Sequence, residues 1–140
     1  MQQLTVIRAL GYAGLIPFLG LALLAWQPIV GTAPQALQLF HVYSALILGF
    51  MAGVLWPALY QTERPASMAV LAVSFPVASF LAFALLPTLV APIQALLFLA
   101  LRLSEIGSGI DRDYAPAYRN LRWQLTGVAV LCHVCVFWLA

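Results

Sequence analysis

Residues 68–103 read MAVLAVSFPVASFLAFALLPTLVAPIQALLFLALRL, an apolar run whose only charged residue is Arg102. A helix needs about 20 residues to cross a hydrocarbon core about 30 Å thick, so this run is long enough for two crossings. The prolines in LLPTLVAP interrupt it near the middle and leave almost no loop. The run therefore predicts two membrane helices, residues 68–86 and 88–103, paired as a tight antiparallel hairpin.

The composition of the whole chain indicates a protein whose solvent is lipid. Of its 140 residues, 64% are hydrophobic and only 7% are charged, whereas about 25% are charged in an average soluble domain. Three more apolar runs, residues 4–26, 35–59 and 121–139, raise the number of predicted spans to five. The first is too long for the apolar part of a signal peptide. We therefore expect an all-α fold, in which residues 1–140 form a single domain of five transmembrane helices.

The charged residues predict the orientation of these helices. With five spans, every charged residue falls on the same side of the membrane: Arg8, Glu63, Arg64, Arg102, Glu105, Asp111, Arg112, Asp113, Arg119 and Arg122. The excess of arginine marks the cytoplasmic side. We therefore expect a multi-pass protein of the cell inner membrane, with its N-terminus in the cytoplasm and its C-terminus outside. Arg8 and Arg102 lie slightly inside the apolar limits, where they are expected to snorkel to the headgroups.

Several functional classes are disfavoured by the same residues. A net charge of +2 without a basic run gives no footprint for nucleic acid. The spans as predicted contain no carboxylate, although proton and cation pumps normally carry one. Neither GxSxG nor HExxH occurs, so hydrolytic chemistry lacks support. We expect a protein without enzymatic activity whose first partner is the lipid bilayer.

The last predicted span contains two cysteines and a histidine in LTGVAVLCHVCVFWLA, residues 125–140. On a helix, His133 and Cys135 point about 160° apart, so these side chains cannot close around one ion. Cys132 and Cys135 have Cβ atoms about 5–6 Å apart, too far for a disulfide. Both cysteines are therefore expected to pack as small apolar residues.

The two histidines lie at nearly equal predicted depth. His41 and His133 are each about 9–10 Å from the outer end of their span, on faces of small residues. Two axial histidines on separate helices are one way in which a bundle holds haem, so a haem or metal site at His41 and His133 is one hypothesis. A neutral histidine bonded to a backbone carbonyl fits equally well. Our main expectation is that the protein has no cofactor.

Small residues and prolines indicate how the helices pack. Gly49 and Gly53 form a GxxxG, which serves either packing within the chain or a dimer, and we favour the former. A stripe of small and aromatic residues runs beside it: His41, Ala45, Gly49, Ala52 and Trp56. Prolines interrupt four spans, at positions 17, 57, 76 and 92. They either shape a cavity or follow the general abundance of proline in membrane helices.

The segment LRLSEIGSGIDRDYAPAYRNLRW, residues 101–123, is the only substantial polar stretch. Pro116 suits the first turn of a helix that leads directly into the last span. Arg112, Arg119 and Arg122 are candidates for contact with anionic headgroups or with acidic groups of a partner. The alternative is that these arginines only orient the last span.

Three stretches resemble a known family: GYAGLIPFLGLALL (residues 11–24), YSALILGFMAGVLW (43–56) and YRNLRWQLT (118–126). The chain is similar to a domain-of-unknown-function family of multi-pass membrane proteins that includes the animal mitochondrial transmembrane protein 69. The resemblance implies a five-helix inner-membrane protein and no particular reaction. It assigns motif-packing roles to Gly14, Pro17, Tyr43, Gly49, Gly53, Trp56, Tyr118, Leu121, Arg122 and Thr126.

The leading functional hypothesis is an accessory or assembly factor that packs against a larger membrane complex. This hypothesis is supported by the stripes of small residues on the predicted helices and by the arginines in the polar segment, residues 101–123. The second hypothesis is a binder or carrier of a small apolar ligand or lipid within a proline-kinked bundle. The third is the haem or metal protein described above.

Overall fold

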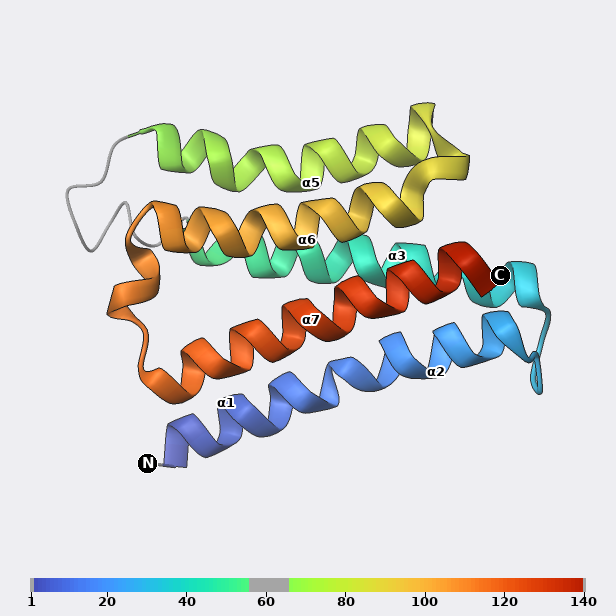
Figure 1. Ribbon diagram of the computed structural model, residues 1–140, viewed down its shortest axis with the longest axis horizontal. Helices are drawn as coiled ribbons and strands as arrows, with labels where there is room; N and C mark the ends of the chain where they lie inside the picture. The colour runs from blue at the N-terminus through green and yellow to red at the C-terminus, as the bar shows by residue number, and fades with distance from the viewer. Residues whose placement is uncertain (1, 56–65, 140) are drawn as a thin grey trace.

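The computed structural model describes residues 2–55 and 66–139 and shows a bundle of long helices (Figure 1). The first span consists of α1 (Gln2–Ala13) and α2 (Leu15–Trp26). It is followed by α3 (Ala33–Ala52), η1 (Gly53–Leu55), α5 (Ser67–Leu85), η2 (Pro87–Leu89), α6 (Val90–Gly107), η3 (Ile110–Asp113) and α7 (Pro116–Leu139).

The prediction of an all-α bundle with five membrane helices is confirmed. Within the described part of the chain, five helices are long and apolar enough to cross a membrane. α5 and α6 form the predicted hairpin. α6 continues to Gly107, beyond the predicted end at residue 103, and α7 begins at Pro116 and runs unbroken into the last span. The predicted end of the second span, residues 56–59, lies outside the described residues.

Local sequence explains where several helices begin and end. Thr32 caps α3, since its side-chain oxygen accepts a hydrogen bond from the backbone N–H of Gln35 at 3.3 Å. After α6, Gly109 adopts a φ of 85°, a left-handed conformation that favours glycine and turns the chain into η3. The first span is divided between α1 and α2 at Gly14, three residues before Pro17. Proline lacks the N–H that would continue the helical ladder there.

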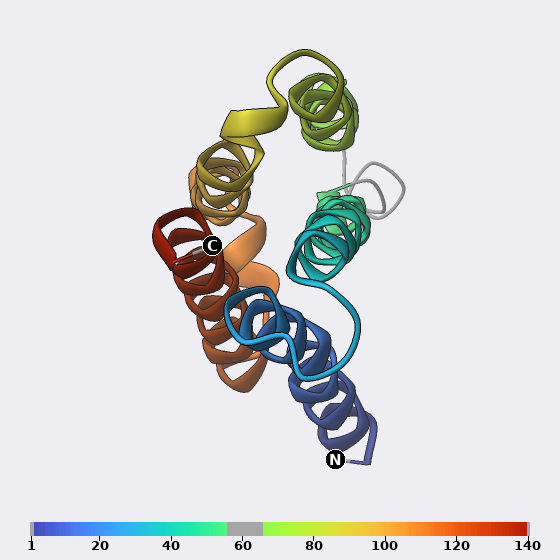
Figure 2. The same cartoon turned by 90° about the vertical axis from the view of Figure 1, so that its right-hand side faces the viewer.

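The helices surround an aromatic centre. Viewed from its end, the bundle places α2 between α3 and α7, and α5 against α3 and α6 (Figure 2). Phe18 of α2 packs edge-on against Phe40 of α3 and Phe98 of α6, with ring centroids 5.8 and 6.0 Å apart. All three are at most 1% exposed. α1, in contrast, contains no buried residue.

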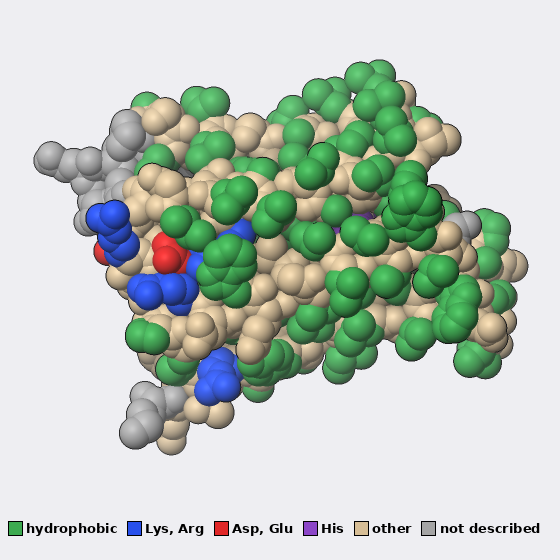
Figure 3. Space-filling model, in the orientation of Figure 1, with side chains coloured by type: hydrophobic (Ala, Val, Ile, Leu, Met, Phe, Trp, Pro, Cys, Tyr) green, Lys and Arg blue, Asp and Glu red, His purple; other side chains and the backbone are tan. Residues whose placement is uncertain are grey.

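The described charged residues lie at one end of the bundle, where α1 begins and α6 leads into α7 (Figure 3). We call this the charged end and the opposite one the uncharged end. The single-sided distribution expected from the sequence therefore holds for the described arginines and acids. Glu63 and Arg64 lie outside the described residues.

Candidate functional site

Glu105 lies at the centre of a buried group of charges at the charged end. It belongs to α6 and is 0% exposed. One of its carboxylate oxygens, Oε2, accepts hydrogen bonds from Arg102 Nη1 at 2.9 Å and from Arg122 Nε at 3.2 Å. The other oxygen, Oε1, contacts Arg122 Nη2. One carboxylate thus links two guanidinium groups, one from α6 and one from α7.

Asp111 of η3 extends this network towards solvent. Its side chain pairs with Arg102 Nη2 and, at 3.2 Å, with Arg119 Nε. Trp123 covers the Arg102 guanidinium, with its ring centroid 4.7 Å from the guanidinium carbon, so a cation–π contact adds to the ion pairs. We refer to Arg102, Glu105, Asp111, Arg119 and Arg122 as the ion cluster.

The ion cluster carries a surplus positive charge. It contains three guanidinium groups and two carboxylates, which gives a formal charge of 3 − 2 = +1. The surplus belongs to Arg119, whose side chain is 39% exposed, because the buried Arg102 and Arg122 are matched by Glu105 and Asp111. Arg112 and Asp113 follow in η3, so the described part of the charged end carries more arginines than acids.

Tyr114 borders the ion cluster without a polar partner of its own. Its hydroxyl is buried, and no hydrogen bond reaches it within the described structure. Burial raises the pKa of Tyr114, the neighbouring Tyr118 raises it further, and Arg102 opposes the shift.

The structure corrects the expected positions of two arginines. Arg102 is 1% exposed, so it does not snorkel to the headgroups as the sequence suggested. Arg122 is 3% exposed and faces inward rather than lying on the outer surface, and its contact with a headgroup or partner stays a prediction. Both guanidinium groups turn inward because they pair with Glu105. Glu105 lies on α6, which continues past the predicted end at residue 103. Arg112 is exposed, and the Arg119 side chain is 39% exposed.

A second polar group lies deeper, where Ser44 of α3 meets His133 of α7. Both residues are 0% exposed. The His133 Nδ1 lies 2.6 Å from the Ala129 carbonyl oxygen, which only accepts, so this nitrogen carries the proton. The Nε2 of the neutral ring then accepts a hydrogen bond from the Ser44 hydroxyl, also at 2.6 Å. The tautomer of His133 is thus fixed by the backbone carbonyl of Ala129, four residues earlier on the same helix.

His41 and His133 lie close together, as their similar predicted depth suggested. Their ring centroids are 6.5 Å apart. Three phenylalanine rings also pack around His133, with centroids at 5.9 Å for Phe18, 4.8 Å for Phe40 and 5.6 Å for Phe98. Because both nitrogens of His133 already have partners, this arrangement leaves neither of them to bind a haem iron. Ligation by His133 would require one of these hydrogen bonds to break, and a haem or metal site at His41 and His133 stays a prediction.

The Ser44–His133 geometry resembles that of a nucleophile and its base, but no substrate can reach it. Activation of a serine by histidine needs both this hydrogen bond and space for a reacting group. Here both side chains are fully buried behind phenylalanine rings. Among the described residues, no group of three or more histidine, cysteine or acidic side chains is placed to hold a metal ion. The contact therefore joins α3 to α7.

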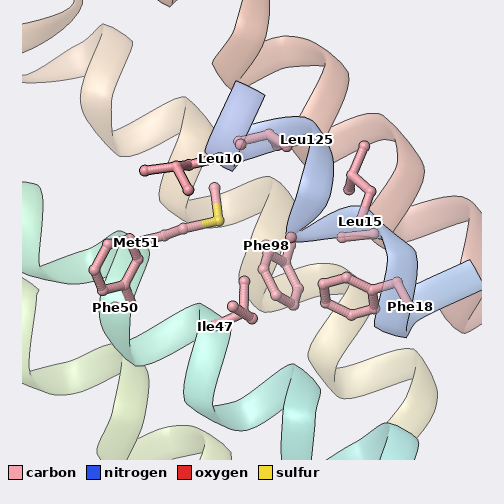
Figure 4. A pocket seen from close by; sticks show the side chains of 11 residues that line it. Leu10, Leu15, Phe18, Ile47, Phe50, Met51, Phe98 and Leu125 are labelled. Carbon is pink, nitrogen blue, oxygen red and sulfur yellow. The ribbon is translucent and has the colours of Figure 1, made fainter. Parts of the chain in front are cut away.

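An apolar pocket of about 100 Å³ lies beside the break between α1 and α2 (Figure 4). Apolar side chains and two glycines line it: Leu10, Gly11, Gly14, Leu15, Phe18, Ile47, Phe50, Met51, Phe98, Leu125 and Ala129. Because Gly11 and Gly14 have no side chains, the break presents bare backbone to this space. We call it the kink pocket.

A larger and more polar space, of about 520 Å³, lies next to the kink pocket near the ion cluster. Its described lining is Gly49, Phe50, Met51, Gly53, Tyr118 and Arg122. Phe50 and Met51 line both spaces, so the two are neighbours along α3. We call the second space the arginine pocket.

The cysteines line a separate apolar groove between α2 and α7. Cys132 is buried, Cys135 is half-buried, and both are free thiols. The groove has a volume of about 280 Å³ and also includes Trp26.

Comparison with known proteins identifies the family. A family model described as "Protein of unknown function (DUF3429)" matches residues 4–138. The chain belongs to this family. No curated protein and no solved structure matches the chain. The DUF3429 assignment supports the expectation of an uncharacterised family of membrane proteins, and the helices are those of an integral membrane protein.

The three stretches on which the resemblance was based meet in this DUF3429 protein. The Tyr43 hydroxyl donates a 2.6 Å hydrogen bond to the Gly14 carbonyl, which joins the first stretch to the second. A Cβ atom on Gly11 would lie 3.0 Å from Leu121 Cδ2, so a larger residue there would require the Leu121 side chain to shift. These contacts place the three stretches around the kink pocket.

The other motif-packing residues are divided between the interior and the surface. Leu121 and Thr126 are each 2% exposed, and Pro17 is half-buried. A Cβ on Gly49 would contact Pro76 of α5 at 3.8 Å, which agrees with packing within the chain. Gly53 is exposed and has open space around it. Trp56 lies outside the described residues.

Proposed function

We propose that this protein is a non-catalytic accessory or assembly factor that packs against a larger membrane complex. The observation that carries this proposal is the weak attachment of its first helix. α1 has no buried residue, and in the most apolar window of the Gln2–Trp26 span only 11% of residues are buried, against 44% in Pro87–Gly107. Helices in lipid associate through close packing, so a helix with one face unused by its own bundle is suited to a partner.

The charged end supports the same proposal. The ion cluster holds α6, η3 and α7 together, and Arg112 and the partly exposed Arg119 lie at its margin. Charged groups at the margin of an interface favour partners of opposite charge. The excess of arginine at this end also supports an inner-membrane protein with a cytoplasmic N-terminus. As part of this proposal, we infer that the protein is related to transmembrane protein 69 of animal mitochondria, because of the three stretches that resemble its family.

Photo-crosslinking in native membranes tests the proposal. A photoreactive amino acid replaces Leu10 of α1, and another replaces Val70 of α5 as the matched control. The two side chains are 67% and 70% exposed, so lipid alone would label both equally. We expect a discrete protein adduct from position 10 and only lipid adducts from position 70. Lipid adducts alone at both positions would contradict an accessory role through α1.

The carrier hypothesis receives less support from the dimensions of the kink pocket. Pockets that enclose a small molecule usually measure about 300–1,000 Å³, whereas the kink pocket has about 100 Å³. The kink pocket has room for part of an apolar chain and not for a complete ligand. The arginine pocket, at about 520 Å³, is within this range, but Arg122 and Tyr118 on its wall make it less suited to an apolar ligand.

A further inference from the structure

Two neighbouring spaces of different chemistry lie between α3 and α7 at the charged end. The kink pocket is apolar and reaches the aromatic centre at Phe18 and Phe98. The arginine pocket lies on the other side of Phe50 and Met51 and has Tyr118 and Arg122 on its wall. The polar arginine pocket lies nearer the ion cluster and the apolar kink pocket lies nearer the aromatic centre. A lipid has the same arrangement, with a polar headgroup followed by an apolar chain.

The charges determine which headgroup fits. The guanidinium of Arg122 belongs to the ion cluster, which has one more positive than negative group. The described residues of the charged end include five arginines and three acids, so this end favours an anionic headgroup, whereas a zwitterionic headgroup brings its own cation. Guanidinium groups also match phosphate oxygens in geometry.

We propose that the arginine pocket and the kink pocket together bind one anionic phospholipid from the leaflet at the charged end. Its phosphate lies at Arg122 and Tyr118. One acyl chain passes Phe50 and places a segment in the kink pocket beside Gly14. The limited volume of the kink pocket suits a chain segment and excludes a bulky ring system.

The family resemblance converges on the same place. Each described residue of the arginine pocket belongs to the second or third of the three stretches, residues 43–56 and 118–126. The first stretch contributes Gly11 and Gly14 to the kink pocket. The residues that relate this chain to its family are thus those that would hold the lipid. This inference goes beyond the proposed accessory role and does not depend on it.

Native mass spectrometry of the full chain tests the site. The protein is reconstituted in nanodiscs of equal parts phosphatidylglycerol and phosphatidylcholine with identical acyl chains, then released from them in the spectrometer. We expect one retained phosphatidylglycerol, in at least tenfold excess over phosphatidylcholine. Excess inorganic phosphate should not displace it, because phosphate lacks the chain that fills the kink pocket.

Two glycine variants provide the matched comparison. Gly53→Leu fills the arginine pocket, and Gly127→Leu adds the same side chain on an exposed face of α7 that lines none of the pockets described above. A Cβ at either position meets nothing within 4 Å, so both variants should fold. We expect Gly53→Leu to reduce retained phosphatidylglycerol at least fivefold and Gly127→Leu to leave it unchanged. Equal retention of the two lipids, equal behaviour of the two variants, or displacement by phosphate alone would overturn the proposal. Because Leu10 lines the kink pocket, the crosslinking is repeated in the Gly53→Leu variant. A protein adduct that persists there supports the accessory role independently of the lipid site.

Discussion

At the scale of single residues, buried polar side chains are held by specific partners on neighbouring helices. Glu105 links Arg102 to Arg122, and Ser44 donates to His133. In each case the partners come from α3, α6 or α7, the helices that form the middle of the bundle. Removal of one partner leaves the other unsatisfied in a low-dielectric interior, which costs more than the contact itself contributes.

Glu105→Gln should be strongly destabilising. Among the described residues, it removes the one carboxylate that touches both Arg102 and Arg122, and we expect a loss of about 3–5 kcal/mol in the free energy of unfolding. Denaturant unfolding in detergent, followed by tryptophan fluorescence, measures it. Asn120→Ala, at an exposed position of α7, is the control and should cost about 0.5 kcal/mol or less. Similar losses for the two variants would show that Glu105 is not central to the network.

Ser44→Ala should have a smaller effect. It removes the donor to His133 Nε2 and leaves that nitrogen buried without a partner, at a cost of about 1 kcal/mol. Ser74→Ala is the control, because Ser74 is exposed and bonds only to the Leu71 carbonyl of its own helix. Thermal unfolding of the two proteins in the same detergent compares them. A larger effect at Ser74 would refute the assigned contact.

Tyr114 predicts a loss of stability at high pH. An unperturbed tyrosine has a pKa of about 10, and burial raises that of Tyr114 in the folded chain. Below about pH 10, Tyr114 is protonated in both the folded and the unfolded chain, so it adds no pH dependence to the stability. As the pH rises further, Tyr114 ionises first in the unfolded chain, which stabilises the unfolded state relative to the folded one. Tyr114→Phe should therefore lessen the fall in unfolding midpoint between about pH 9 and 11. Because its hydroxyl has no hydrogen bond within the described structure, the variant should not lose stability at pH 7. A steeper fall in the variant would contradict the buried position.

At the scale of helices, the first span behaves as two parts. α2 packs between α3 and α7, whereas α1 touches mainly α7. Gly11 of α1 approaches Leu121 of α7, and the Tyr12 hydroxyl donates a 2.6 Å hydrogen bond to Gln124 Oε1. In Figure 1, α1 continues α2 in nearly the same direction on the other side of Gly14. α1 should therefore loosen more readily than any other described helix.

Gly11→Leu should detach α1 without unfolding the bundle. A Cβ there approaches Leu121 to 3.0 Å and forces α1 away from α7. We expect faster hydrogen exchange in residues 2–13 and little change in global unfolding, because α1 buries no residue. Gly20→Leu, where a Cβ meets nothing within 4 Å, is the control. Unchanged exchange in α1 would mean that α7 does not hold it.

The sequence was sufficient for the helices and insufficient for their buried contacts. Apolar runs and prolines predicted the hairpin of α5 and α6, with both ends of α5 correct to within one residue. The end of α6 was missed because hydropathy treats Arg102 and Glu105 as a loop, although their spacing of three is that of an ion pair on a helix. Ser44 and His133 are 89 positions apart, and no single sequence shows that α3 and α7 are neighbours. The kink pocket was missed for the same reason.

At the scale of the whole molecule, the charges divide the bundle into two unlike ends. The uncharged end includes the turn between α2 and α3 and the turn between α5 and α6. The described arginines and acids all lie at the other end. In a membrane, this asymmetry should give a single orientation.

Reporter fusions should show that orientation. A cytoplasmic reporter, such as a fluorescent protein that folds only inside the cell, should be active when joined to the N-terminus or inserted between Gly107 and Pro116. It should be inactive after Trp26 or at the C-terminus, where a periplasmic phosphatase should be active instead. Activity of one reporter at all four places would contradict both the five spans and the proposed orientation.

The five helices are unequal in length, and this gives the protein a preferred membrane thickness. α5 has 19 residues and α7 has 24, about 28 and 36 Å respectively. In Figure 1, α7 slants across the bundle while α5 runs along it. A bilayer whose hydrocarbon thickness equals the length of α5 therefore requires α7 to tilt from the membrane normal. A thicker bilayer would reduce this tilt and strain the contact between α7 and Gly11. Lipids of different chain length should thus alter the packing of the first helix without any change in sequence.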